Sequence, residues 1–219
     1  MTIVEILKTI ARDISSIYQV NAEELLALYD SVKLQAEQLQ LRSSRPYKQI
    51  EKNCWDGVIS ETGLVTALKT VTGNLSATRN PRRHNPKDVL SYGYDIDATF
   101  ENLIAQHAIE QTDDYRLEVK KVDFDGDIPV FYFNYNPENK NGLDLTTFIN
   151  KGHLLADFLV LVGIRENTEI CGFDVKPKYI IRSDMFIQAY KKCEDGESYL
   201  THKIDLNKMI EQGHAIKIQ

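Results

Sequence analysis

Residues 115–124 read "YRLEVKKVDF", and they decide how the fold is assigned. Apolar and polar residues alternate along this stretch, which predicts a β-strand because side chains at i, i+2 and i+4 share one face. Leu117 and Val119 would lie on one face, and Glu118 and Lys120 on the other. A carboxylate and an ammonium group on the same face of an internal strand need a physical reason, which the surrounding chain must supply.

The composition is that of a globular protein with one large core. The chain has 219 residues, of which 42% are hydrophobic and 26% charged. A net charge of -6 excludes a protein that coats nucleic acid by bulk attraction, so any such contact must be local. The three cysteines show no C-x-x-C spacing, which argues against a disulfide scaffold or a zinc ribbon. No apolar run approaches the roughly 18 residues of a membrane span. We therefore expect a cytoplasmic protein without membrane contact.

The first third of the chain has the periodicity of helices. Apolar residues recur at spacings of three and four over residues 2–19, which predicts an amphipathic helix. A second helix is expected over residues 21–41, because Asn21 is a good N-cap and Glu24 completes a capping box. A third helix is expected over about residues 56–72.

A boundary is expected between the second and third helices. The polar segment 42–53, "RSSRPYKQIEKN", contains Pro46 and interrupts the helical pattern. We accordingly divide the chain into an N-terminal helical region, residues 1–45, and an α/β domain, residues 46–219.

After residue 88 the sequence pattern changes from that of helices to that of strands. Alternating runs at residues 89–100, 115–124 and 128–136 predict three consecutive strands in a meander. Helical spacing follows over residues 143–156, and then "DFLVLVGI" at residues 157–164 is typical of a strand buried on both faces. This order predicts an α/β fold built around a mixed sheet.

An acid in one strand, a Glu-x-Lys in the next, and then a strand, a helix and a buried strand resemble the PD-(D/E)XK nuclease superfamily. The resemblance covers about residues 57–182. It implies a restriction-endonuclease-like mixed sheet flanked by helices. Glu118 and Lys120 match the Glu and Lys of the family motif.

The resemblance implies further acids near this pair. Asp95 in "GYDID" matches the preceding acid of the motif, with Asp97 as its competitor. Glu61 lies on the helix that resembles the N-terminal core helix of the family, which often adds another carboxylate.

The implied chemistry explains why these residue types share a face. Hydrolysis of a phosphodiester uses Mg²⁺ or Mn²⁺ held by a few oxygen ligands, with positions left for water and phosphate. Asp95, Glu118 and the backbone carbonyl of Val119 could supply those ligands. Lys120 would orient the water or neutralise developing charge. The expected activity is a metal-dependent endonuclease acting on DNA, as a type II restriction or other defence enzyme, and a homodimer would suit the cutting of both strands.

One basic stretch bears on the substrate. In "SATRNPRRHNPKD" four cations are close in sequence and precede the strand with the first acid. Such a loop could hold a nucleic-acid backbone. The candidate nucleic-acid-binding residues are Arg79, Arg82, Arg83 and Lys87.

Two alternatives stand beside the nuclease. Glu118 and Lys120 on an exposed strand could be an ordinary solvated pair, which would suit a non-catalytic module of the same fold that binds nucleic acid or protein. Asp157 with the "DVK" at Asp174 and Lys176 forms a competing acid and Glu-x-Lys-like set. Pro177 follows immediately and disfavours a central strand there.

Overall fold

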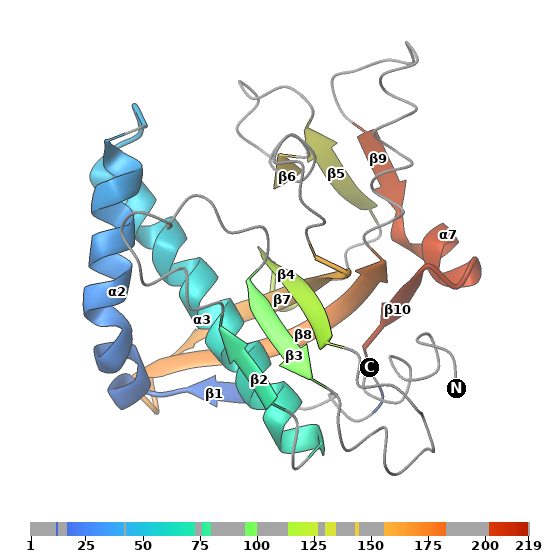
Figure 1. The fold of residues 1–219 in the computed structure, drawn as a ribbon, viewed down its shortest axis with the longest axis horizontal. Helices are drawn as coiled ribbons and strands as arrows, with labels where there is room; N and C mark the ends of the chain where they lie inside the picture. Colours follow the sequence, from blue (N-terminus) through green and yellow to red (C-terminus); the bar gives the residue numbers. More distant parts are fainter. Residues whose placement is uncertain are drawn as a thin grey trace.

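The computed structural model describes residues 12, 17–41, 43–72, 76–79, 95–99, 114–126, 130–134, 143–144, 156–182 and 202–218. Two long helices, α2 and α3, lie side by side next to a large sheet, and a small second sheet lies above it (Figure 1). In chain order the elements are β1 (Tyr18–Val20), α2 (Ala22–Gln40), α3 (Tyr47–Thr72), β2 (Ser76–Arg79), β3 (Ile96–Thr99), β4 (Asp114–Val122), β5 (Val130–Asn134), β6 (Leu143–Asp144), β7 (Phe158–Asn167), β8 (Gly172–Arg182), β9 (His202–Asp205), α7 (Leu206–Glu211) and β10 (Ala215–Lys217).

The predicted start of the second helix is confirmed. The Asn21 side chain accepts hydrogen bonds from the backbone of Glu23 and Glu24, and the Glu24 carboxylate accepts one from the Asn21 amide. These bonds satisfy amide groups that have no partner within the helix. The capping box therefore sets where α2 begins.

The predicted start of the third helix is wrong, because α3 begins at Tyr47 rather than near residue 56. Pro46 directly precedes the helix, and its carbonyl accepts from Gln49 and Ile50. A proline without an amide hydrogen costs nothing at a helix start, since the first amides have no partner in any case. The proline therefore marks the beginning of α3.

The predicted α/β fold with N-terminal helices and a mixed sheet is confirmed. The main sheet has seven strands in the order β1-β8-β7-β4-β3-β2, with β10 also paired to β8. β4 and β7 are parallel, and the other pairs in this sheet are antiparallel. A parallel pair needs a crossover, and the chain between β4 and β7 carries β5 and β6 of the second sheet.

The predicted meander is correct for its first two strands and wrong for its third. Its first members are β3 and β4, but β5 pairs with β6 and β9 in the second sheet. The strand on the other side of β3 is β2, which the sequence had assigned to a loop. Alternation predicts a strand but not its neighbour, and a short strand such as "SATR" carries little alternation.

Two predicted helices differ from the structure. Tyr18–Val20, at the end of the first predicted helix, form β1 and pair with β8. Of the residues before Ile17, only Arg12 is described, and it is helical. Leu143 and Asp144, the first residues of the predicted helix over 143–156, form β6, and most of the remainder lies outside the described residues.

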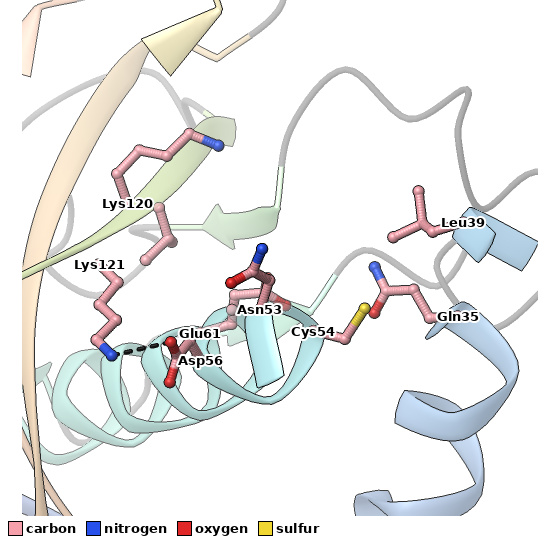
Figure 2. Close-up of a pocket in the computed structure, with 10 residues that line it drawn as sticks. Gln35, Leu39, Asn53, Cys54, Asp56, Glu61, Lys120 and Lys121 are labelled. Carbon is pink, nitrogen blue, oxygen red and sulfur yellow. Dashed lines mark hydrogen bonds and ion pairs between the residues drawn. The ribbon is translucent and has the colours of Figure 1, made fainter. Parts of the chain in front are cut away.

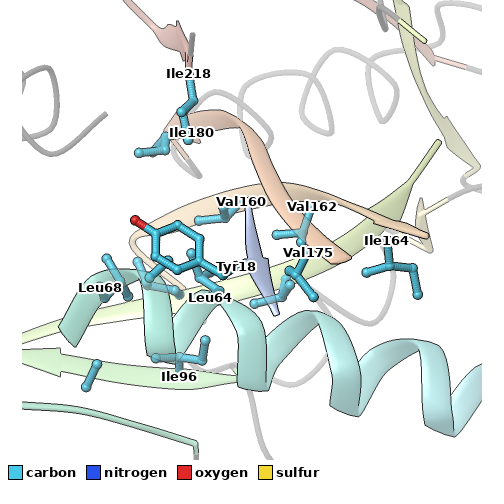
Figure 3. Close-up of a cluster of buried hydrophobic side chains, with 14 of the residues drawn as sticks. Tyr18, Leu64, Leu68, Ile96, Val160, Val162, Ile164, Val175, Ile180 and Ile218 are labelled. Carbon is cyan, nitrogen blue, oxygen red and sulfur yellow. The ribbon is translucent and has the colours of Figure 1, made fainter. Parts of the chain in front are cut away.

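The core lies between α3 and one face of the main sheet (Figure 3). Leu64 and Leu68 of α3 pack against Val160 and Val162 of β7. The helix approaches closely at Gly63, where an added Cβ would overlap the Val175 side chain of β8. Packing at this density is what holds α3, and every side chain it carries, at a fixed position over the sheet.

The expectation that Pro177 disfavours a central strand is wrong, because β8 pairs with β7 both before and after this residue. On its other edge, β8 pairs with β1 at residues 173–175 and with β10 at residues 179–181. Pro177 falls in the gap between these outer strands, and the β7 register shifts between Leu161 and Val162 opposite it. A missing amide hydrogen is tolerated at such an irregularity.

Within the described part of the chain, no helix has the length and apolarity needed to cross a membrane.

Candidate functional site

The first candidate acid, Asp95, is bound directly to the strand that carries the Glu-x-Lys. Its amide donates to the Leu117 carbonyl at 2.8 Å, and its carboxylate Oδ2 accepts from the Val119 amide at 2.7 Å. Asp95 is 2% exposed. A buried carboxylate needs such partners, because burial without them is costly. Asp95 therefore lies against the backbone between Glu118 and Lys120.

Glu118 and Lys120 lie on one face of β4 and form an ion pair. Lys120 Nζ is 2.5 Å from Glu118 Oε1, and the two side chains are 37% and 14% exposed. Leu117 and Val119 belong to the core under α3, so the predicted alternation of β4 is confirmed. The charged face of the strand is thus half-buried and holds both signs of charge.

Glu61 and Arg79 form a second, more deeply buried ion pair. Arg79 Nε donates to Glu61 Oε2 at 3.0 Å, and the side chains are 10% and 1% exposed. Arg79 lies on β2, opposite Ile96 in β3, and so one residue from the strand position of Asp95. The pair links α3 to β2, next to the first candidate acid.

A cavity of about 420 Å³ opens between α2, α3 and β4, and we call it the α2–α3 cavity (Figure 2). It shares Glu61, Val119 and Lys120 with the candidate site. Its full lining is Gln35, Leu39, Asn53, Cys54, Asp56, Gly57, Glu61, Val119, Lys120 and Lys121.

Asp56 is the centre of the charge network on the α3 side of the cavity. Its Oδ2 lies 2.9 Å from both Lys52 Nζ and Lys121 Nζ. The hydrogen bond to Asp56 raises the pKa of Lys52 above its usual value. Sequence reasoning missed the Asp56–Lys121 pair, because its members are far apart in the chain and only the packing of α3 on β4 brings them together.

The competing set around Asp157 and Asp174 is not brought together. Asp157 precedes β7, and its Oδ2 accepts from the Arg116 amide at 2.8 Å. Asp174 lies opposite Arg165, near the other end of β7, and bonds to Arg165 and Asn167. The two acids therefore cannot serve one site.

The oxygen ligands that a divalent cation would need are present in part among the described residues. Asp95 and Glu118 offer carboxylates, and Val119 offers a carbonyl. No group of three or more His, Cys, Asp or Glu side chains in the described ranges is arranged to hold a metal. An all-oxygen set of this size suits a hard ion that keeps several water ligands, as Mg²⁺ does.

Several predicted residues lie wholly or partly outside the described ranges. The backbone of Asp97 lies in β3 opposite Arg116, and its side chain is outside them. Arg82, Arg83 and Lys87 also fall outside the described residues.

Comparison with models of known protein families gives no match. Comparison with curated proteins and with solved structures gives none either. The function is therefore inferred from the geometry of this chain.

Proposed function

We propose that the protein is a metal-dependent nuclease that hydrolyses phosphodiester bonds in DNA. One observation carries the proposal: the Asp95 carboxylate accepts a hydrogen bond from the Val119 amide, between Glu118 and Lys120. An acid that directly precedes β3 is thus bonded to the backbone of β4 between Glu118 and Lys120. A solvated strand face would not require a buried acid from the neighbouring strand at that position.

The order of the elements supports a restriction-endonuclease-like fold. α3 is followed by the antiparallel strands β2, β3 and β4, and β7 then pairs in parallel with β4. The family resemblance found in the sequence implies an acid at the second of these strands and Glu-x-Lys on the third. Asp95 directly precedes β3, and Glu118 and Lys120 lie on β4.

The proposed metal ligands are Asp95, Glu118 and the carbonyl of Val119. A Mg²⁺ or Mn²⁺ ion held there would act as a Lewis acid on a phosphate oxygen. Asp95 is fixed by its bond to the Val119 amide, so its carboxylate is held at one place beside β4. Glu118 lies on the half-buried face of β4, with its side chain 14% exposed.

Lys120 is the proposed charge-stabilising residue. Its side chain is 37% exposed and lines the α2–α3 cavity, so its ammonium can reach a phosphate beside Glu118. An ammonium aimed at the oxygens that gain charge during phosphoryl transfer stabilises the transition state more than the ground state. We expect this interaction to contribute about 3 to 4 kcal/mol to lowering the barrier.

The second candidate is a non-catalytic module of the same fold that binds nucleic acid or protein. The Glu118–Lys120 ion pair favours it, because each group already neutralises the other without any ligand. In that case the pair, which lies along one strand, contributes only a few tenths of a kcal/mol to stability.

Cleavage with a matched inactive variant tests the proposal. Purified protein is incubated with plasmid DNA, linear DNA and RNA, in Mg²⁺, in Mn²⁺ and in EDTA. We expect metal-dependent cleavage that Glu118→Ala abolishes, with the variant still folded by circular dichroism. The control is Glu166→Ala, an exposed acid on β7 that does not line the cavity. Cleavage by Glu118→Ala at the wild-type rate would refute the assignment.

A further inference from the structure

The α2–α3 cavity continues from the proposed site into the space between the two helices. Val119 and Lys120 form its wall on β4, and Figure 2 shows Asn53 pointing into it from α3, with Gln35 facing it from α2. A substrate group next to a phosphate held at Lys120 could therefore enter the cavity without leaving the site. At about 420 Å³ the cavity is within the range of about 300–1,000 Å³ that is typical of small-ligand sites.

The charges that line the cavity cancel. Asp56 and Glu61 contribute two carboxylates, and Lys120 and Lys121 two ammonium groups. Asp56 is paired with Lys52 and Lys121, and Glu61 with Arg79. A phosphate inside the cavity would compete with these carboxylates for their cations, so a neutral polar group fits better.

The remaining lining suits a flat ring with polar edges. Asn53 carries a carboxamide, which can donate and accept hydrogen bonds, as the edge of a nucleobase requires. Leu39, Cys54 and Val119 supply apolar surface for the face of a ring.

We infer that the α2–α3 cavity binds one unpaired nucleobase of the substrate strand. This inference rests on the proposed function and adds that the substrate is single-stranded or locally opened at the cleavage site. A base that is already paired presents its edge to its partner, and the cavity has room for a single nucleotide unit.

Asn53 allows the inference to be tested without touching the proposed catalytic residues. It is exposed on α3, and Asn53→Leu keeps a similar side-chain size while removing its hydrogen-bonding groups. Leucine also has the higher helix propensity, so the variant should fold. The matched control is Gln49→Leu, which removes an exposed carboxamide one turn earlier on α3 and outside the cavity lining.

The experiment compares two labelled strands by fluorescence anisotropy in EDTA, where no cleavage occurs. One is a short single-stranded oligonucleotide, and the other has the same number of phosphates but abasic sugars throughout. We expect the wild type and Gln49→Leu to bind the base-containing strand at least about tenfold tighter than the abasic strand. In Asn53→Leu this preference should fall by about three- to tenfold.

Two results would overturn the inference: equal affinity of the wild type for both strands, or a preference that Asn53→Leu retains in full. Cleavage in Mg²⁺, measured on the same preparations, separates this failure from failure of the proposed function. Cleavage without a base preference removes the cavity inference alone. A base preference lost in Asn53→Leu, without any cleavage, supports the cavity and refutes the nuclease. No binding and no cleavage of either strand refutes both.

Discussion

The buried ion pair between Glu61 and Arg79 makes a quantitative prediction about the helix that frames the site. The charged atoms lie 3.0 Å apart, and the side chains are 1% and 10% exposed. At an effective dielectric constant of about 20, this distance corresponds to about 5 to 6 kcal/mol of attraction. Desolvation of both groups offsets much of that energy when the protein folds. Removing one partner leaves the other charge buried, so Glu61→Ala and Arg79→Ala should each lower the free energy of unfolding by about 3–5 kcal/mol.

A double-mutant cycle isolates the interaction. The variants are Glu61→Leu, Arg79→Met and the two together, and urea unfolding is followed by the fluorescence of Trp55, the single tryptophan. Trp55 lies on α3 and packs against the core between α3 and the main sheet and against a second buried cluster between α2 and α3, so its signal reports the release of that helix. This second cluster consists of Val32, Ala36, Ile50, Cys54 and Val58. The double variant should be within about 1 to 2 kcal/mol of the wild type, because neither buried charge remains.

A cost of less than about 1 kcal/mol for each single variant, which is the behaviour of an exposed pair, would contradict this prediction. Additive single effects in the double variant would also contradict it, because additivity means that the side chains do not interact.

Three further predictions concern packing and charge away from the site. Gly63→Ala should destabilise the protein by about 1–3 kcal/mol in thermal unfolding, because its Cβ would overlap Val175; an unchanged melting temperature would contradict the close packing. The hydrogen bond from Asn167 lowers the pKa of Asp174, so this carboxylate stabilises the fold above pH about 4 and loses that contribution as the pH falls through its lowered pKa. Asn167→Ala should therefore cost more stability at pH 7 than at pH 3 in urea unfolding, and an equal cost would be inconsistent with this linkage. Lys178→Met should cost about 2–4 kcal/mol in urea unfolding, because it leaves three backbone carbonyls of the turn after β4 without their ammonium donor, and a loss below about 0.5 kcal/mol would exclude that role.

Local patterns in the sequence predicted the features that depend on neighbouring residues. The capping box at Asn21 and Glu24 and the alternation along β4 are both found in the structure. Each depends on residues within a few positions of one another, where side-chain chemistry and backbone geometry are directly linked.

Features that depend on distant contacts were not predictable. Arg79 was expected in an exposed loop, yet it lies in β2 and pairs with Glu61 because α3 packs over that strand. The four residues that pair β5 with β6 likewise carry no local sign of their partners. Strand neighbours and buried ion pairs follow from tertiary packing, which periodicity within one segment does not encode.

The proposed role of Lys120 is to stabilise charge that forms only during cleavage, and single-turnover kinetics measured beside equilibrium binding separates this role from substrate binding. The two measurements use the wild type and Lys120→Ala with the same DNA and Mg²⁺. We expect Lys120→Ala to bind DNA and metal nearly as well as the wild type, while its cleavage rate constant falls by roughly 10² to 10³. Equal cleavage rates for the two proteins, or a wild type that cleaves no nucleic acid with any divalent metal, would contradict it.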